Sequence, residues 1–585
     1  MTSSAGHAGE DSDRQRSRKP FARLVRHCID RVMHGGGEAG PGELDFGIGA
    51  LLAVLAAPGA FVSVFMVWKY GPLFQFLHGV SHFNAYAASL PDEYFFIVLA
   101  MVVTGAVAVW KWDALIPDRR DYVNLAPLPI PSKHILYANM TALLLLAAVL
   151  ALDVNAVSAV LFPLVATGLQ SSMGYTAVFF ATHLLSVFLA SVFSFFIVLA
   201  ILGTMMMVLP YGTFRRCSVY VRCGMIVFLM AVLSTSFAMT GILEHMSRTP
   251  RPFVELLSPA WFAGLCQHLR GLKDPVFAVL AKTAVIATAA VLALALGAYA
   301  LSYRRCFAKS SKSISHFAAV GRAIRRSRLR GVTDLFLRTP FERACFRFTL
   351  RTLFRSEDHT LIVGGFTGIG IVLASEVLFQ AAAEKNAEPS AAALSIPLVV
   401  IYLLLLGLRF SFEVPVILRA NWIFRLRTNP DASESVGLAR KVMLTFLVPL
   451  LLAVCLPAYG SVWSWRLGVI HTCVVAAASI LLIEILLVRF RKIPFTCSAP
   501  HFKSNILVSI LFYFLGFVVF TSWVPVVEEW AFEDSVWYAA LLAALAAIWL
   551  VLQHYRGELK YIEKRLIFEE QPDTSVERLD LTFSR

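Results

Sequence analysis

Charged residues are scarce in this sequence of 585 residues, and their scarcity argues against a soluble fold. Only 15% of the residues are Asp, Glu, Lys or Arg, whereas 58% are hydrophobic and the mean hydropathy is +0.69. A water-soluble protein of this length needs more polar side chains to cover its surface. The composition therefore predicts an all-α integral membrane protein that crosses the bilayer many times.

Several catalytic and ligand-binding signatures are also missing. The nine cysteines are scattered without a C-x-x-C pair, which argues against a zinc site or a disulfide framework. There is no G-x-x-x-x-G-K-[ST] phosphate-binding loop and no convincing protease or esterase motif. We therefore expect no catalytic residue, no cofactor and no metal in this chain, and any ATPase that drives it must be a separate subunit.

Twelve apolar runs are long enough to cross a bilayer as helices, since about 20 apolar residues span its hydrocarbon core. They form two groups of six, separated by a polar and basic stretch. The fourth run is long enough to extend beyond the lipid, and the ninth is short. The predicted spans are 44–68, 93–112, 134–152, 176–209, 217–242, 275–303, 359–380, 394–410, 442–456, 467–488, 505–522 and 536–554.

Lys and Arg residues predict the direction of the chain, because they favour cytosolic loops. With the amino end in the cytosol, 44 of the 52 Lys and Arg residues fall in cytosolic segments. Two more, Lys69 and Lys282, lie at or within spans. The six in outside loops are Arg248, Arg251, Arg270, Lys273, Lys385 and Arg466. Topology thus accounts for the net charge of +14, so we predict cytosolic termini and do not expect nucleic-acid binding.

The six-plus-six pattern predicts two parallel repeats, because both halves enter the membrane from the same side. The predicted parts are a tail (1–43), a first half (44–303), a basic cytosolic linker (304–358), a second half (359–555) and a tail (556–585). An amphipathic stretch precedes each half. One is residues 21–33, and the other carries Arg343, Arg347, Arg351 and Arg355 at every fourth position. Each is either a linker bound to membrane lipid or a lever that feeds force to its half.

A charged and proline-rich joint, DRRDYVNLAPLPIPSKHI at residues 118–135, follows the second span. Its prolines prevent the two flanking helices from running on. This stretch resembles the joint between the second and third helices of type 2 ABC exporter permeases, the ABC-2 class. The matching residues are Asp118, Arg119, Arg120, Asp121, Leu125, Leu128, Pro129, Ser132, Lys133, Ile135 and Leu136.

The resemblance implies a permease with two six-helix halves in a bacterial cytoplasmic (inner) membrane, where the joint docks on a separate ATP-binding subunit. It also implies a short outer segment between the fifth and sixth helices of each half. The second half has a comparable joint at residues 412–431, although its LRANWIFRL run departs from the family pattern. The candidate residues there are Glu413, Arg419, Asn421, Trp422 and Arg425. The plain alternative for both joints is a helix-breaking loop that carries positive charge.

Few ionisable residues lie within the predicted spans. Lys282 and Glu376 lie near outer ends, Glu484 lies near the inner surface, and His183 and His471 lie in outer halves, where polar packing is the expected role. None is at mid-membrane, which disfavours a carrier coupled to protons or sodium. We therefore predict the permease of an ATP-driven exporter. A secondary transporter and a non-transporting membrane scaffold or biogenesis protein are the alternatives.

Overall fold

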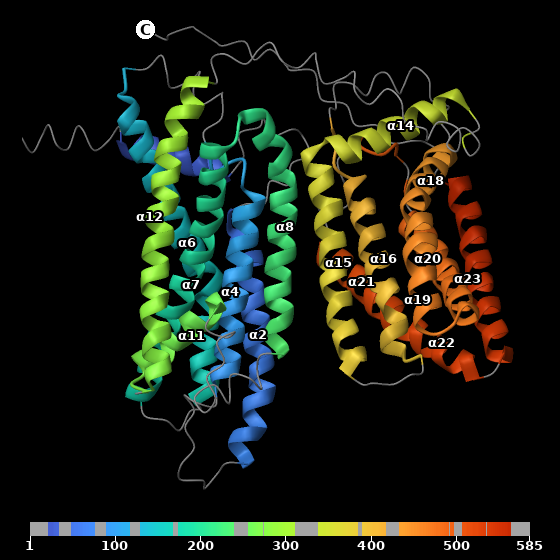
Figure 1. Cartoon of the computed structure of the whole chain (residues 1–585), viewed down its shortest axis with the longest axis horizontal. Coiled ribbons are helices and arrows are strands. Elements are labelled where there is room, and N and C mark those ends of the chain that lie inside the picture. Colours follow the sequence, from blue (N-terminus) through green and yellow to red (C-terminus); the bar gives the residue numbers. More distant parts are fainter. Residues whose placement is uncertain are drawn as a thin grey trace, which may run out of the picture. The chain divides into compact units, whose positions relative to one another are not determined.

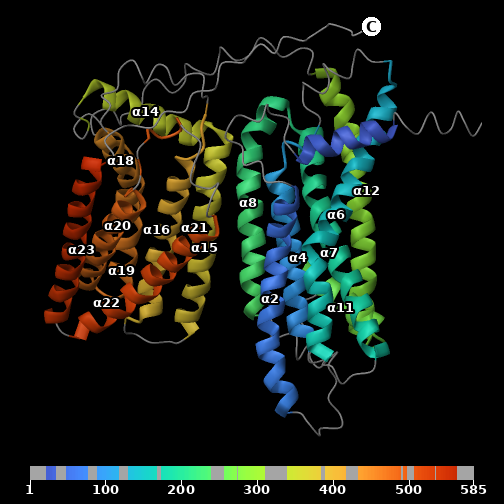
Figure 2. The same ribbon diagram turned by 180° about the vertical axis from the view of Figure 1, so that it is seen from behind.

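The structure is a computed structural model of an all-α protein (Figures 1 and 2). Eleven helices in its described part are long and apolar enough to cross a membrane, and the helix α2 adds a shorter apolar stretch, Val54–Tyr70. The prediction of about twelve spans is confirmed. The described residues are 21–33, 48–76, 89–116, 129–167, 173–238, 256–272, 274–309, 337, 339–383, 389–416, 432–488, 490, 492–496, 506–533 and 535–562. The chain divides after Val320 into two compact units, unit 1 and unit 2.

In its described residues, unit 1 contains a short amphipathic helix and six long helices. The short helix, residues 21–33, lies across one end of the bundle (Figure 2), where Val25 and Cys28 pack against Ala138 and Ala142. We call this end the interfacial end and the opposite one the far end. The long helices are α2 (Ile48–Phe76), α4 (Leu90–Trp110), α6 (Ser132–Thr167), α7 (Met173–Val208), α8 (Tyr211–Ala238) and α12 (Pro275–Lys309). A further short helix, α11 (Ser258–Leu269), lies at the far end (Figure 1).

Unit 2 repeats this order of elements. Its interfacial helix α14 (Pro340–Arg355) lies across one end of the bundle and buries Cys345, Phe346, Thr349 and Leu353 (Figure 1). The next spans are α15 (Glu357–Ala383), α16 (Ala391–Ser411), α18 (Ala432–Leu450) and α20 (Trp465–Leu486), followed by α21 (Ile506–Val518) and α23 (Ser535–Ile562). The π-helix η3 (Leu451–Cys455) and α19 (Leu456–Val462) continue α18, and η5 (Val519–Trp523) and α22 (Val524–Glu533) continue α21.

Two spans of unit 2 continue through a proline where the sequence predicted an end. The predicted ninth span, 442–456, is too short, because the apolar helix extends over Ser435–Val462. The eleventh likewise runs on past residue 522 into α22. Pro457 and Pro525 lack an N–H, and their rings press on the carbonyls four residues back, at Ala453 and Thr521. Those two residues are the centres of η3 and η5, so the wider π turn accommodates each proline without ending the helix.

The third span is also longer than its predicted range of 134–152. The helix α6 continues to Thr167 although Asp153 and Asn155 interrupt the apolar run. Asn155 donates from Nδ2 to the carbonyl of Ala151 at 2.7 Å and to Oγ of Ser191 on α7 at 3.0 Å. Because this buried amide is satisfied within the bundle, it holds α6 against α7 and does not end the helix.

Most packing partners are the same in the two units. In each, the second span contacts the fourth and fifth, and the fourth contacts the third and sixth. The short far-end helix, α11 or α22, contacts the second and sixth spans. The first span differs, because α2 packs mainly against the third span α6, whereas α15 packs against the second span α16.

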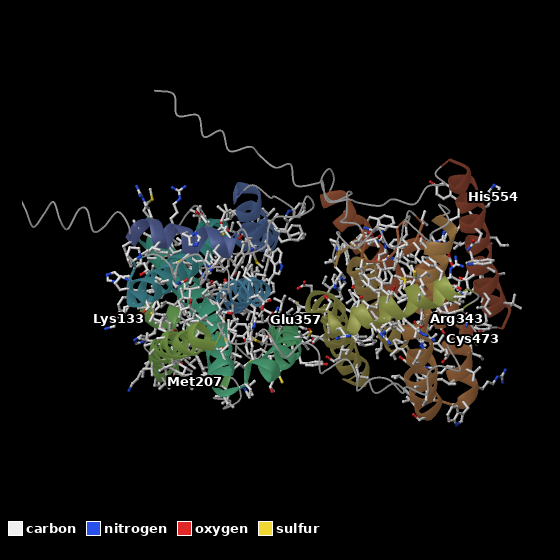
Figure 3. The ribbon with its side chains drawn as sticks, turned by 90° about the horizontal axis from the view of Figure 1, so that it is seen from above. Lys133, Met207, Arg343, Glu357, Cys473 and His554 are labelled. Atoms are coloured by element: carbon white, nitrogen blue, oxygen red, sulfur yellow. The ribbon has the colours of Figure 1, made fainter. Side chains whose placement is uncertain are left out.

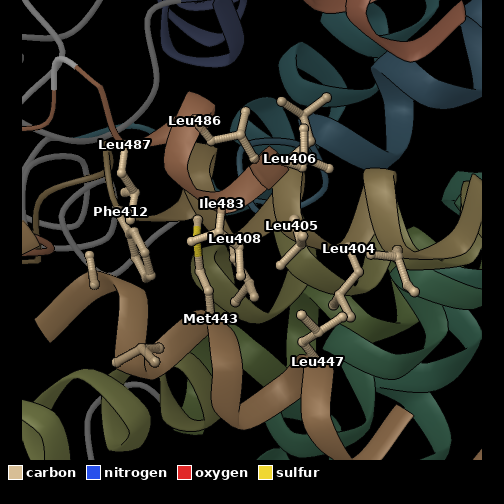
Figure 4. Close-up of a cluster of buried hydrophobic side chains, with 14 of the residues drawn as sticks. Leu404, Leu405, Leu406, Leu408, Phe412, Met443, Leu447, Ile483, Leu486 and Leu487 are labelled. Atoms are coloured by element: carbon tan, nitrogen blue, oxygen red, sulfur yellow. The ribbon is translucent and has the colours of Figure 1, made fainter. Parts of the chain in front are cut away.

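The core of unit 2 holds α16, which leads into the joint of this unit, against α18 and α20. Leu404, Leu405 and Leu408 of α16 pack with Met443 of α18 and Ile483 of α20, and all five are buried (Figure 4). Inside a membrane such contacts stabilise through close packing, since the lipid is as apolar as the side chains. The end of α16 therefore holds a defined position at the interfacial end.

Candidate functional site

The structure describes only a part of the predicted joint in unit 1. Pro129 and Lys133 are described, and both are exposed. Lys133 lies in the first turn of α6, at the edge of the bundle (Figure 3). This part of the joint is therefore open to a partner. The predicted residues Asp118, Arg119, Arg120, Asp121, Leu125 and Leu128 lie outside the described residues.

Both ends of this joint are attached to the bundle. On the side of the second span, Trp112 is completely buried, and Asp113 accepts a hydrogen bond from Nη2 of Arg222 on α8 at 2.6 Å. On the side of the third span, Oδ1 of Asn139 accepts from Nη2 of Arg31 in the interfacial helix at 3.1 Å. The joint is thus linked to the second, third and fifth spans and to the interfacial helix.

In unit 2, Glu413 is the predicted joint residue that the structure describes, and it lies in an ion-pair network. Its carboxylate pairs with Arg409 and with Lys492, while Nε of Arg409 donates to the carbonyl of Leu486 at 3.0 Å. Burial alone would raise the pKa of Glu413, but the two cations outweigh burial and hold that pKa below its ordinary value. Arg419, Asn421, Trp422 and Arg425 lie outside the described residues.

Hydrogen bonds to backbone carbonyls hold the start of the joint in unit 2 in place. The N–H of Val416 donates to the carbonyl of Phe495 at 3.2 Å, and the N–H of Phe495 donates to the carbonyl of Phe412 at 3.3 Å. Nε2 of His359, in the first turn of α15, lies 2.9 Å from the carbonyl of Val414. Because a carbonyl only accepts, Nε2 carries the hydrogen. The chain that leaves α16 is thus fixed both to α15 and to the segment 492–496.

A second kind of polar cluster is buried at the far end of unit 1. Glu93, in the first turn of α4, is completely buried and accepts two hydrogen bonds from Arg270, at 2.7 and 2.9 Å. Sγ of Cys266 and Nε2 of Gln267, both on α11, donate to the same carboxylate at 2.6 and 3.1 Å. Nδ1 of His183 on α7 lies 3.3 Å from it. Three elements therefore meet at one carboxylate whose charge is balanced by a guanidinium.

The guanidinium of Arg270 is itself held in place. It lies over the ring of Phe179, 3.8 Å from the centroid, and its Nε donates to Oγ1 of Thr182 at 3.0 Å. The neighbouring Asp92 is paired separately, with Lys69 at 2.7 Å and with the hydroxyl of Tyr70 at 2.6 Å. The far end of unit 1 thus contains two carboxylates, each with its own cation.

The far end of unit 2 has a related but simpler pair. Oε1 of Glu528 on α22 lies 2.9 Å from Nδ1 of His471 on α20, and both residues are completely buried. The ring of Tyr459 lies 4.4 Å from the His471 ring, and its hydroxyl donates to the carbonyl of Ala393 at 2.6 Å. Within the described ranges, Oε2 of Glu528 and Nε2 of His471 have no hydrogen-bond partner.

Glu484 lies in a third cluster, toward the interfacial end of unit 2. Its carboxylate accepts from Nη2 of Arg440 on α18 at 2.9 Å and pairs with Arg556 near the end of α23. Arg556 also donates to the backbone carbonyl of Glu484. The sequence predicts Glu484 near the inner surface, and its described partners come from the third and sixth spans.

Both histidines stand out in the sequence, but their partners do not. His183 and His471 were expected in polar packing, and each lies against a carboxylate. The sequence does not predict Glu93 and Arg270 as site residues, because Glu93 is 90 residues from His183 and 177 residues from Arg270 along the chain. It does not predict Glu528 because this residue lies in an outer connector. A usable signal was Arg270, one of only six basic residues in outside loops. A basic residue in an outside loop runs against the preference of Lys and Arg for cytosolic loops, and this indicates that it pairs with a buried acidic residue.

In the part of the chain that the structure describes, no group of three or more His, Cys, Asp or Glu side chains could hold a metal ion. What the arrangement offers is charge pairing within each bundle and two joints at interfacial ends. Comparisons of the chain with protein-family models, with curated proteins and with solved structures give no match.

Proposed function

We propose that this chain is the membrane-spanning permease of an ATP-driven exporter, similar to the type 2 ABC class, and that a separate ATPase drives it. The observation that carries the proposal is an order of elements that occurs twice. Among the described residues, each unit has an interfacial helix, six membrane helices and a joint after the second span, and a short helical segment at the far end precedes the sixth span, namely the separate helix α11 in unit 1 and α22, the last part of the fifth span, in unit 2. This order agrees with what the resemblance in the first joint implies for the whole chain.

The two joints supply the docking surface in this proposal. Each follows the second span of its unit, and the joint in unit 1 combines exposed Lys133 with Arg119 and Arg120. Charges on such a surface speed the encounter with a soluble partner and determine the register of docking. The proposal places both joints and both termini in the cytosol of a bacterium, where ATP is available to the partner.

The attachments of the joints give this surface a mechanical role. A push on the joint in unit 1 reaches the fifth span through Asp113 and Arg222, and the interfacial helix through Arg31 and Asn139. In unit 2 the corresponding push reaches α15 and the segment 492–496 through the backbone contacts beside Glu413. Several helices of a unit would therefore respond together, as alternating access requires.

A secondary transporter is the second candidate. The observation that favours it is the buried acid–histidine pair at the far end of each unit, because ionisable groups inside membrane helices often belong to ion pathways. A secondary transporter would move its substrate in sealed vesicles under a proton gradient without nucleotide. The exporter would require ATP and the separate subunit.

The proposal is tested by purifying the full chain in a mild detergent and identifying the proteins that accompany it. We expect an ATP-binding subunit to co-purify. The variant Arg119→Glu/Arg120→Glu should lose most of this subunit while still inserting in the membrane, because the other cytosolic loops keep most of the positive charge. The matched control is Arg325→Glu/Arg326→Glu, which makes the same charge reversal in the linker between the halves and should retain the subunit.

Two outcomes would contradict the proposal. One is that the chain purifies without any ATP-binding subunit, and the other is that both double variants retain it equally. The orientation is tested separately with reporter fusions after Arg330 and at Arg585, which should both report the cytosol. An external signal at either position would place the joints on the wrong side for ATP.

A further inference from the structure

The pair of Glu528 and His471 is half satisfied. One oxygen of the carboxylate and one nitrogen of the ring lie 2.9 Å apart, whereas Oε2 and Nε2 find no partner among the described residues. Both side chains are completely buried. A buried polar atom without a partner is costly, so this arrangement requires an explanation other than packing.

Among the described residues, no cation faces this pair. The groups that surround it come from neighbouring elements, and none of them carries a positive charge. They are Tyr459 of α19, Cys455 of η3 and Tyr538 of α23, with Thr472 of α20 beside Cys455. The adjacent charge on α22 itself is another acid, Glu529.

The buried surroundings of the pair favour a state without net charge. With Glu528 ionised and His471 neutral, Nδ1–H donates to Oε1 and the pair carries one uncompensated negative charge in a medium of low polarity. One added proton, on the carboxylate or on the ring, makes the pair neutral overall and keeps the contact between Oε1 and Nδ1. In unit 1 the guanidinium of Arg270 already supplies the positive charge that neutralises Glu93.

We propose that Glu528 and His471 form a proton-binding site, in which one exchangeable proton takes the place that Arg270 occupies in unit 1. A proton is the ligand class that suits two completely buried groups, because it needs no cavity. Loss of the proton leaves one uncompensated charge between α20 and α22, so proton occupancy changes the charge that these two elements bury. This inference does not rest on the proposed function, and it applies equally to an exporter and to a secondary transporter.

The test is infrared difference spectroscopy of the full chain in lipid nanodiscs, titrated with acid and base around neutral pH. A protonated carboxyl group has a carbonyl stretching band that a carboxylate lacks. We expect the wild-type chain to show one such band that titrates, and Glu528→Gln to lose it. The matched control is Glu93→Gln, which removes a buried carboxylate that is already paired with Arg270 and should leave the titrating band unchanged.

A second variant keeps the test decisive if Glu528→Gln does not fold. His471→Gln retains the carboxyl group but replaces its titratable partner by an amide, so the same band should remain and shift in frequency. The inference is overturned if the wild-type chain shows no titrating carboxyl band, if Glu528→Gln retains the band, or if Glu93→Gln removes it.

Discussion

In unit 1 the buried carboxylate at the far end comes from the second span, whereas in unit 2 it comes from the short helix before the sixth. Both lie against a histidine of the fourth span. Glu93 accepts hydrogen bonds from Arg270, Cys266 and Gln267, whereas His471 is the one hydrogen-bond partner that the described part of the chain offers to the carboxylate of Glu528. The same order of helices can therefore hold a permanently neutralised site in one unit and an incompletely paired site in the other.

The first spans show a second difference, and glycines explain it. A side chain at Gly59 of α2 would meet the carbonyl of Val154 on α6 at 3.2 Å. In unit 2, a side chain at Gly407 of α16 would meet Cβ of Phe366 on α15 at 2.8 Å. Each first span therefore lies close to a different neighbour, α6 in unit 1 and α16 in unit 2, and small residues permit the approach.

The largest predicted effect is at Arg270. Arg270→Leu removes the cation from a carboxylate that is completely buried, and breaking a buried pair in this way costs about 3–5 kcal/mol of unfolding free energy. We expect a clear fall in the thermal unfolding midpoint in detergent. The double variant Arg270→Leu/Glu93→Leu should recover much of the loss, because no unpaired charge remains. A loss below about 1 kcal/mol in the single variant would mean that Glu93 does not depend on Arg270.

The next effect concerns the first span of unit 2. Gly407→Ala places a methyl group 2.8 Å from Cβ of Phe366, and overpacking of this kind costs about 1–3 kcal/mol. Gly297→Ala on α12 is the matched control, since no described residue beyond the adjacent turns of α12 lies within 4 Å of the added methyl group. Thermal unfolding of both variants checks the prediction. Equal stability would show that α15 and α16 do not pack as closely as described.

Glu413 should make the stability of unit 2 depend on pH. Its pKa in the folded chain lies below the ordinary value of about 4.3, so its contribution is complete above that pH and is lost as the pH falls through the folded pKa. Glu413→Gln should cost about 1.5–3 kcal/mol near neutral pH, because Arg409 and Lys492 lose a charged partner. The gap between the unfolding midpoints of the variant and the wild type should close in acid. A gap that stays constant with pH would contradict this account.

The smallest predicted effects compare the interfacial helices. Glu342 of α14 pairs with Lys441 on α18, and both side chains are largely covered, so Glu342→Gln should cost about 1 kcal/mol. Asp30 lies 3.9 Å from Arg26 on the same exposed helix surface, and Asp30→Asn should cost less than about 0.5 kcal/mol. Unfolding midpoints of the two variants measure the difference. The reverse order would show that α14 is not tied to α18 by this pair.

Much of the architecture was predictable because hydropathy and charge placement are local signals. The spans, the amphipathic helix 21–33 and the basic stripe of α14 are readable from residue spacing alone. The predicted spans end too early where a residue that usually breaks a helix is accommodated by its surroundings. Pro457 and Pro525 are accommodated by π turns, and Asn155 is satisfied by Ala151 and Ser191, so none of the three ends its helix.

The far-end clusters were not predictable in the same way. Glu93 stood at the edge of a predicted span and Glu528 stood in an outer connector, where an acidic residue is ordinary. Their significance depends on partners such as Arg270 and His471, which are close only after the helices have packed. Hydrophobic runs in the sequence predict that the helices exist, but they do not predict which helices pack against each other.

The most direct test of the central claim, that the chain is driven by a separate ATPase through its joints, is the ATP hydrolysis rate of the purified complex in lipid nanodiscs. The account predicts that hydrolysis accompanies the wild-type chain and falls sharply for Arg119→Glu/Arg120→Glu, while Arg325→Glu/Arg326→Glu retains the wild-type rate. Absence of hydrolysis from the wild-type preparation, or an equal rate in all three preparations, would contradict it.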